Sequence, residues 1–425
     1  MKRIILYFSI VISLFLSSCK NNENPVTDNN SNEPIEEGVQ RGFIENEVPN
    51  SPKAWTFMLY DDADFTDSFD PLNSFSSRMY STANINVLVL QDTVGADAKL
   101  WFINEGGELV LLKNLGEINM GSAETLSNFI EFGKYVYPSE RTIVSFYNHG
   151  SGWDGACTDV TDHDMLSMDD MCTAITENGG IDLIFFSAPC LMGSVESMYE
   201  LRDCVDIYLG SENTSGYLLW LYPMESIREL LQTHPTISND QLGISVVQFI
   251  EEDLSMWGNF DLTDITMSAV KTNRMQEVKN LFADIADNLY NDQYHFKVTM
   301  DAVKDTLTNF YDYNLDLHHL LEAIKSNCDD ANLCSKIIEL QEIIETSVLA
   351  EVHGEAFPHA KGIAIYFPSA DRFSERYRDV NQNLDWTSQT LWDELIYNYL
   401  SGEKHLFKNT TIIPEHLYEG QLMNF

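Results

Sequence analysis

The segment IVSFYNHGSGW, residues 143–153, decides the fold, because an apolar run ends there in a polar, glycine-rich turn. Four of its first five residues are β-branched or aromatic, and the run predicts a buried strand. A second segment of the same kind, IDLIFFSAPCLM, spans residues 181–192. The exits of parallel strands share one edge of a sheet, so we expect His149 and Cys190 to lie close together.

The chain around these two segments alternates expected strands with expected helices. Further strands are predicted at residues 55–60, 85–90 and 205–209, and a hairpin at 100–112. A helix is predicted over 122–136, with Ser122 as its N-cap. Such alternation predicts an α/β fold whose sheet is mainly parallel and covered by helices on both faces.

The first residues have the pattern of a targeting segment. Lys2 and Arg3 precede an apolar stretch, residues 4–16, which is short for a membrane span. The stretch ends in Leu-Ser-Ser-Cys at residues 16–19, which resembles a lipobox, the bacterial signal for lipid attachment to a cysteine. An ordinary secretory signal with an incidental cysteine is the alternative. We expect export and a lipid anchor on Cys19.

Composition divides the chain into four regions. Residues 20–50 are rich in Asn, Glu, Pro and Ser and predict a flexible tether after a signal peptide at 1–19. The strand–helix pattern predicts a catalytic domain over 51–237. Residues 238–425 predict a helix-rich region, with one late strand at 362–368.

The charge of the chain is strongly negative: 66 acidic against 25 basic residues give a formal net charge of -41. Nucleic acid is therefore not an expected partner, because phosphate binding needs a basic surface. A cationic peptide or protein substrate would be attracted. The alternative is that the acidity only keeps an exported protein soluble.

His149 and Cys190 together have the chemistry of a thiol hydrolase. An imidazole beside a thiol can take its proton to give the attacking thiolate, and can return that proton to a leaving amine. Alone, His149 could be a turn residue and Cys190 a buried apolar residue. The glycines that flank His149 leave backbone N–H groups accessible to an oxyanion, which favours the catalytic interpretation.

The two motifs resemble those of the clostripain-like cysteine peptidases, relatives of the caspases, gingipains and legumains. The similarity covers His-Gly-Ser-Gly-Trp at 149–153 and Cys-Leu-Met-Gly-Ser-Val-Glu at 190–196, and it extends from residue 55 to about residue 399. It implies a caspase-like three-layer α/β/α sandwich. It also implies His149 as the proton-transfer residue, Cys190 as the nucleophile, and an oxyanion hole from the N–H groups of Gly150 and Cys190.

Two positions depart from the family pattern. Members that cut after Arg or Lys typically have an Asp two residues before the cysteine, where this chain has Ala188. Three acidic residues could supply a replacement charge: Asp203, Asp206 and Glu212. Several relatives also cut themselves after a basic residue in the loop following the histidine. Residues 142–201 contain no Lys or Arg, so composition excludes that cleavage here.

Other polar clusters are weaker signals. An acidic run could bind calcium but is interpreted as a solvated loop: Asp61, Asp62, Asp64, Asp67 and Asp70. His353 and His359 lack a third metal ligand and are interpreted as loop residues. No cofactor or metal is therefore expected. Cys328 and Cys334 could bridge a short loop in an exported chain, although sequence alone does not fix the pairing.

These observations predict a lipid-anchored cysteine endopeptidase that acts outside the cytoplasm, in the periplasm or at the cell surface. One alternative is a catalytically silent homologue that binds proteins or peptides, suggested by the altered Ala188-Pro189 pocket. Another is a thiol hydrolase or transferase that acts on a non-peptide amide with the same two residues.

Overall fold

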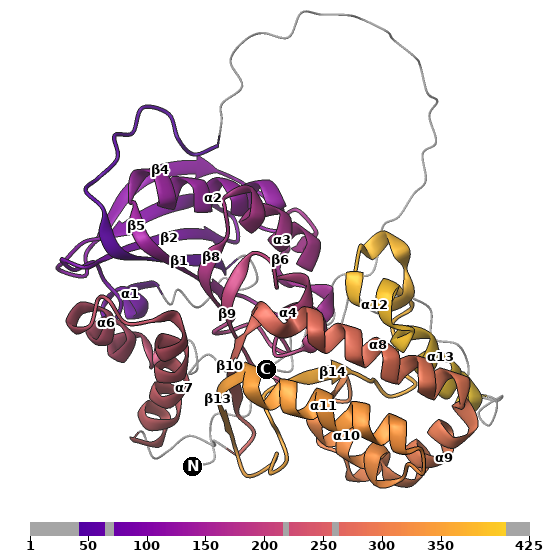
Figure 1. Ribbon diagram of the computed structural model, residues 1–425. Helices are drawn as coiled ribbons and strands as arrows, with labels where there is room; N and C mark the ends of the chain where they lie inside the picture. Colours follow the sequence, from indigo (N-terminus) through magenta and orange to yellow (C-terminus); the bar gives the residue numbers. More distant parts are fainter. Residues whose placement is uncertain (1–41, 64–71, 216–220, 257–262, 405–425) are drawn as a thin grey trace, which may run out of the picture. The chain divides into compact units, whose positions relative to one another are not determined.

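One nine-stranded sheet, in the order β13-β10-β9-β8-β5-β1-β2-β3-β4, organises the residues that the computed structural model describes: 42–63, 72–215, 221–256 and 263–404 (Figure 1). Its five central strands are parallel: β9 (Val205–Gly210), β8 (Ile181–Phe185), β5 (Ser139–Tyr147), β1 (Lys53–Ala63) and β2 (Ile85–Thr93). The outer strands pair antiparallel: β3 (Ala96–Ile103), β4 (Leu109–Gly116), β10 (Thr266–Lys271) and β13 (Val348–His353).

Helices cover both faces of this sheet, because successive side chains of a strand point to opposite sides. In β1, Trp55, Phe57 and Leu59 pack into one hydrophobic cluster, and Met58 and Tyr60 pack into another. The first cluster is closed by α1 (Leu72–Ser76), α6 (Met224–Thr233) and α7 (Asn239–Met256), and the second by α2 (Ala123–Val136), α3 (Met168–Glu177) and α4 (Val195–Glu200) (Figure 1). The three-layer α/β prediction is confirmed.

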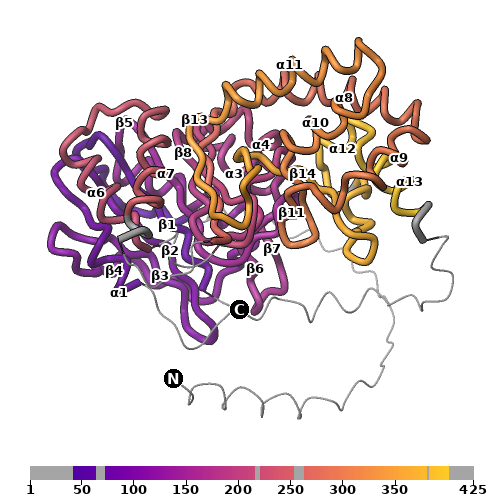
Figure 2. The backbone as a smooth tube through the Cα atoms, turned by 90° about the horizontal axis from the view of Figure 1, so that it is seen from below, coloured from indigo at the N-terminus to yellow at the C-terminus, as the bar shows by residue number. Residues whose placement is uncertain are grey.

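A group of helices from the C-terminal half packs beside α4 (Figures 1 and 2). Trp386 packs edge-on against Tyr199 of α4, with 5.7 Å between the ring centroids. The group contains α8 (Met275–Asn291), α9 (Gln293–Val303), α10 (Leu317–Ser326), α11 (Ala331–Ser347), α12 (Asp385–Thr390) and α13 (Trp392–Lys404). A small sheet lies with them: β11 (Asn309–Phe310), β12 (Asn314–Asp316) and β14 (Ala364–Tyr366).

The ends of several elements follow local sequence signals. The Ser122 hydroxyl accepts a hydrogen bond from the N–H of Glu124 and caps α2, as predicted. Strands β10 and β13 were not singled out from sequence. β13 follows α11 directly, with no turn residue between Ser347 and Val348, so the apolar pattern gives no stop signal.

Among the described residues, no helix combines the length and the apolar character that crossing a bilayer requires.

Candidate active site

His149 and Cys190 follow two adjacent parallel strands at the same edge of the sheet. β5 and β8 pair in register from Ile143 opposite Leu183 to Ser145 opposite Phe185. His149 lies just beyond the end of β5, and Cys190 lies just beyond the end of β8. The topology therefore brings the two motifs to one edge, where open α/β sheets form their sites.

The backbone makes the contact between the two motifs. A Cβ atom built on Gly150 would lie 2.5 Å from the carbonyl oxygen of Cys190 and 2.9 Å from its nitrogen. Real Cβ atoms essentially never approach this closely, so only glycine fits beside the Cys190 peptide. The residue that follows His149 thus lies directly against the backbone of Cys190.

Asn148 fixes the backbone on the other side of His149. Its side-chain amide donates to the carbonyls of Asp62, at 2.8 Å, and of Thr158, at 3.2 Å. Its Oδ1 accepts a hydrogen bond from the N–H of His149. The His149 carbonyl in turn accepts from the N–H of Cys157, at 3.1 Å. The histidine therefore projects from a segment whose backbone groups are tied on both sides.

The segment after β9 holds the Cys190 segment in place. The N–H of Ser215 donates to the Cys190 sulfur at 3.2 Å, and the Ser215 hydroxyl donates to the Ser187 carbonyl at 3.2 Å. The N–H of Leu191 donates to the Asn213 carbonyl at 2.9 Å. Leu191 also has a φ of 61°, an uncommon value for a residue with a side chain. Such strain persists only where surrounding contacts impose it, as they do here.

The surroundings of Cys190 and His149 favour the neutral form of both side chains. Burial raises the pKa of the Cys190 thiol, and the hydrogen bond from Ser215 opposes this only in part. Burial lowers the pKa of the His149 imidazole. A neutral thiol and a neutral imidazole are the forms from which general-base activation of a thiol starts.

Apolar residues of the C-terminal half cover the Cys190 segment. Cys190 and Leu191 form a small hydrophobic cluster with Phe310, Ala360 and Ala364. The N–H of Ala364 donates to the Gly193 carbonyl at 2.8 Å and joins β14 to this segment. The surroundings of the thiol are therefore largely apolar, in agreement with its raised pKa.

The four residues predicted for substrate binding lie in different places. Ala188 is buried two residues before Cys190. Asp203 and Asp206 lie at the N-terminal end of β9, next to the start of β8 and at the opposite sheet edge from Cys190. There Asp203 pairs with Arg202, and Asp206 accepts from Asn239 at 2.9 Å.

Glu212 lies at the same edge as Cys190 but is buried. Its nitrogen lies 2.6 Å from where a Cβ of Gly193 would be, and its Oε2 accepts from the N–H of Gly362 at 3.2 Å. Burial, and after it the neighbouring Asp316, raises the pKa of this carboxyl well above the ordinary range. Glu212 is therefore enclosed by the protein, and its surroundings disfavour the charged form that could bind a cationic side chain.

The acidic run at the end of β1 is only partly described, since Asp64, Asp67 and Asp70 lie outside the described residues. The expectation of a solvated loop is wrong for Asp61 and Asp62, which are fully buried because β1 continues through them. Gln91 of the neighbouring strand donates to Asp61 Oδ2 at 2.9 Å.

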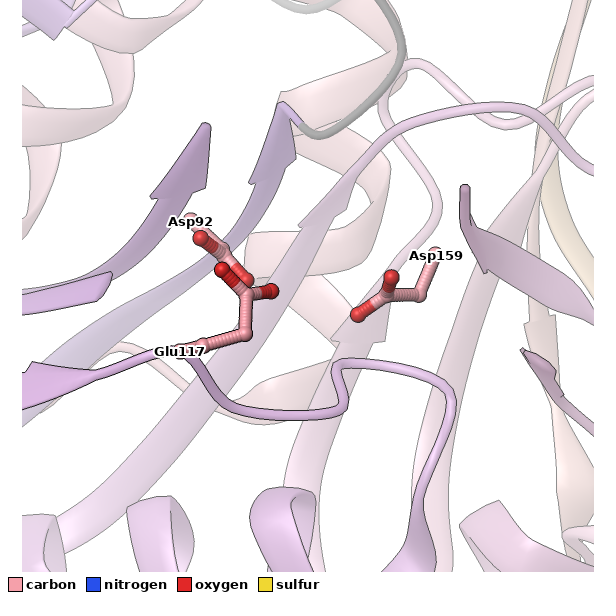
Figure 3. Close-up of side chains that lie close together, drawn as sticks. All are labelled: Asp92, Glu117 and Asp159. Atoms are coloured by element: carbon pink, nitrogen blue, oxygen red, sulfur yellow. The ribbon is translucent and has the colours of Figure 1, made fainter. Parts of the chain in front are cut away.

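Three other carboxylates gather near this strand end, at Asp92, Glu117 and Asp159 (Figure 3). One oxygen from each lies within 4.8 Å of the others, and such oxygen ligands suit a hard cation such as calcium. Asp159 also accepts hydrogen bonds from the N–H groups of Met120 and Asp162, both at 2.8 Å. This carboxylate therefore already organises the adjoining loops.

The two histidines considered for metal binding have separate partners. His353 Nδ1 lies 2.8 Å from Glu351 Oε2, and the ring of His359 packs on that of His319, with 4.7 Å between centroids. Cys328 and Cys334 are free thiols whose side chains hydrogen-bond, so the bridge expected between them stays a prediction.

Two residues of the site were missed from sequence. Asn148 directly precedes His149, and its place at a strand exit was the available signal. Ser215 follows β9, the parallel neighbour of β8, so only knowledge of the strand order identifies it.

Comparisons with known proteins agree with this arrangement. The clostripain family model matches residues 58–399. Clostripain of Hathewaya histolytica is 22% identical, over 92% of this chain and 88% of its own. A secreted C11 cysteine protease of Bacteroides thetaiotaomicron, crystallised with an irreversible peptide inhibitor, has a TM-score of 0.59 at 17% identity, covering 80% of this chain and all of that chain.

An inactive zymogen C11 protease of Parabacteroides distasonis has a TM-score of 0.58 at 17% identity, covering 81% of this chain and 99% of that chain. At these identities the solved structures support the fold alone. The match to the family model supports common ancestry with the clostripain family. The chain belongs to the clostripain family of cysteine peptidases.

Proposed function

We propose that this protein is a cysteine endopeptidase in which Cys190 is the nucleophile and His149 transfers the proton. The approach of Gly150 to the Cys190 backbone carries the proposal, because it joins the two motifs at one sheet edge. Family membership supports peptides and proteins as the substrate class.

The proposed reaction starts from the neutral pair. His149 takes the Cys190 proton as the thiol attacks the substrate carbonyl, and the resulting imidazolium donates that proton to the leaving amine. The intermediate is a thioester on Cys190. Water then attacks the thioester, and His149 acts as a base in this second half.

The oxyanion of the tetrahedral intermediate needs donors beside the reacting carbon. We assign the N–H groups of Gly150 and Cys190 to this role, since the two backbone segments are in contact. Tied backbone groups around Asn148 and Leu191 hold these donors in place before substrate arrives.

Covalent labelling tests the proposal. A peptidyl acyloxymethyl ketone should alkylate Cys190, as located by peptide mass mapping, and Cys190→Ala should abolish cleavage of a mixed peptide library with its thermal unfolding unchanged. Wild-type protein that is folded but neither labelled nor active would instead indicate a silent homologue, for which the buried thiol and Ala188 are the motivation. Full activity of Cys190→Ala would overturn the assigned nucleophile.

We further propose that the enzyme does not favour Arg or Lys before the cleaved bond. Ala188 supplies no charge, Glu212 is buried and its pKa is raised, and Asp203 and Asp206 lie at the other sheet edge. A guanidinium or ammonium group is bound strongly only where a carboxylate faces it.

The lipobox-like residues 16–19 support export and a lipid anchor on Cys19, although they lie outside the described residues. Wild-type protein made in a bacterial host should partition into detergent and incorporate an alkynyl fatty acid. Cys19→Ala should do neither, and incorporation by that variant would contradict the anchor.

A further inference from the structure

A second pair of cysteines lies away from the proposed active site. Cys172 is on helix α3, and Cys204 directly precedes β9. Their side chains hydrogen-bond to each other, and both interact with the hydroxyl of Thr176, which lies 3.9 Å from the Cys172 sulfur. Both are free thiols in the structure. Two elements far apart in the sequence thus place their sulfurs side by side.

The backbone at both positions is held by regular structure. The Cys204 N–H donates to the Leu201 carbonyl at 3.1 Å, and its carbonyl accepts from the N–H of Ile181 at 2.9 Å. Helix α3 begins with a capping box in which Ser167 and Asp170 exchange hydrogen bonds. The two sulfurs therefore meet because the fold fixes their positions.

The two thiols differ in reactivity. Hydrogen bonding from Cys204 lowers the pKa of Cys172 to about 6, while the same interaction and burial raise the pKa of Cys204. Cys172 is half-buried and lines an open cavity of about 490 Å³ together with Asp169 and Arg202. A small disulfide reagent can therefore reach the thiol whose surroundings favour the thiolate form.

We propose that Cys172 and Cys204 are a redox-active pair that forms a disulfide with a disulfide-donating oxidant. The Cys172 thiolate attacks one sulfur of the donor, whose S–S bond breaks and releases a thiolate. The Cys204 thiol gives its proton to that thiolate and attacks the Cys172 sulfur, which releases the second half of the donor as a thiolate. The pair loses two electrons, and the donor becomes one thiol and one thiolate that takes a proton from water.

The bond would tie α3 to the start of β9. The loop that it closes, residues 172–204, contains β8 and the whole Cys190 segment. Closing a loop of this size stabilises the folded chain by restricting the unfolded one. Cys190 is not consumed, since its sulfur is held by Ser215 at the opposite sheet edge. An exported chain would meet such donors, but the geometry holds wherever the chain resides.

Peptide mapping tests the pairing without reference to activity. The full chain is reduced, exchanged into oxidised glutathione, blocked with iodoacetamide and digested without reductant. We expect a pair of peptides joined through Cys172 and Cys204. Cys190 and Cys157 should be alkylated or, where burial shields the thiol from iodoacetamide, unmodified. Separate alkylation of Cys172 and Cys204, or stable glutathione on Cys172, would overturn the proposal.

Thermal unfolding provides a second readout. A Cys328→Ser/Cys334→Ser variant serves as the background, so that the other cysteine pair contributes nothing. Oxidised glutathione should raise its Tm by roughly 3–8 °C relative to a reduced sample. Adding Cys172→Ser should remove that difference and leave the Tm of the reduced sample within about 2 °C. An unchanged difference in the triple variant would contradict the pair. Neither readout depends on catalysis by Cys190, so failure here leaves the proposed peptidase intact.

Discussion

The thiols of Cys190 and Cys172 have pKa values that the protein shifts in opposite directions. Cys190 is buried, its pKa is raised, and its neighbours are backbone N–H groups and apolar side chains. Cys172 is half-buried, and a second thiol lowers its pKa to about 6. The cysteine whose surroundings favour the thiolate is therefore the one that we do not assign to catalysis.

The difference shows that a low pKa does not by itself mark the nucleophile. Cys190 has the backbone of Gly150 beside it, in the segment that contains His149, and in the proposed mechanism these groups act once a carbonyl is bound. Cys172 has only another sulfur and a hydroxyl within hydrogen-bond reach. The following changes test whether geometry rather than resting ionisation decides the outcome.

Removing the proposed base should have the largest effect. His149→Ala leaves the Cys190 proton without an acceptor, so kcat/KM should fall by roughly 10³-fold. His353→Ala, which removes a half-buried histidine paired with Glu351, is the matched control and should stay within about two-fold. A His149→Ala enzyme with normal kcat/KM on a peptide substrate would show that Cys190 is activated by some other group.

A single methyl group should separate the two motifs. The added Cβ of Gly150→Ala would lie 2.5 Å from the Cys190 carbonyl oxygen and must displace the nucleophile segment. Since small misplacements of catalytic groups cost about 10²-fold, we expect a loss of that order in kcat. Gly106→Ala, whose Cβ would meet side-chain atoms of Asn104 at 3.3 Å and of Glu108 at 3.9 Å, should retain full activity. Equal rates for the two variants would contradict the contact.

A charge beside Cys190 should change which residue is cut after. Ala188→Asp places a carboxylate where trypsin-like relatives have one, and cleavage after Arg relative to cleavage after apolar residues should rise about 10-fold. Ala188→Asn has the same size without the charge and should leave that ratio unchanged. The ratio is measured with paired peptides that differ only at the residue before the cleaved bond. An equal rise with Asn would show that size, not charge, sets the preference.

Much of the fold follows from local patterns. The runs at 143–147 and 181–186 are too apolar for anything but a buried strand, and they became β5 and β8. Ser122 gave the start of α2. Strands β10 and β13 could not be found in this way, because they lie at the end of the sheet next to long helices. β10 pairs with β9, and β13 pairs with β10. These strands are far apart in the sequence, so local patterns do not specify the pairing.

Some features of the candidate site could likewise be predicted from local sequence, and others could not. The meeting of the His149 and Cys190 segments follows from parallel strand exits, a rule that sequence can use. Burial of Asp61, Asp62 and Glu212 does not follow, because each is a polar residue that packing covers from elsewhere in the chain. The position of Ser215 against the sulfur depends on the strand order. The shifts in the pKa values of these side chains could therefore be inferred only from contacts in the structure.

The smallest effects concern pH, namely the pH profile of kcat/KM and the ionisation of Cys190 and Cys172. The lowered pKa of His149 keeps the imidazole neutral, and able to accept a proton, down to pH values below its ordinary 6.5. The raised pKa of Cys190 keeps the thiol protonated above its ordinary 9.0. The acid limb of kcat/KM should therefore have its midpoint below 6.5, and the alkaline limb should lie above 9.0. Thiolate absorbance of the reduced protein near neutral pH should fall in Cys172→Ser and persist in Cys190→Ala, since the pKa of Cys172 is lowered to about 6 whereas that of Cys190 is raised. The reverse pattern would mean that Cys190 rests as a thiolate beside an imidazolium, and the contrast between the two cysteines would no longer hold.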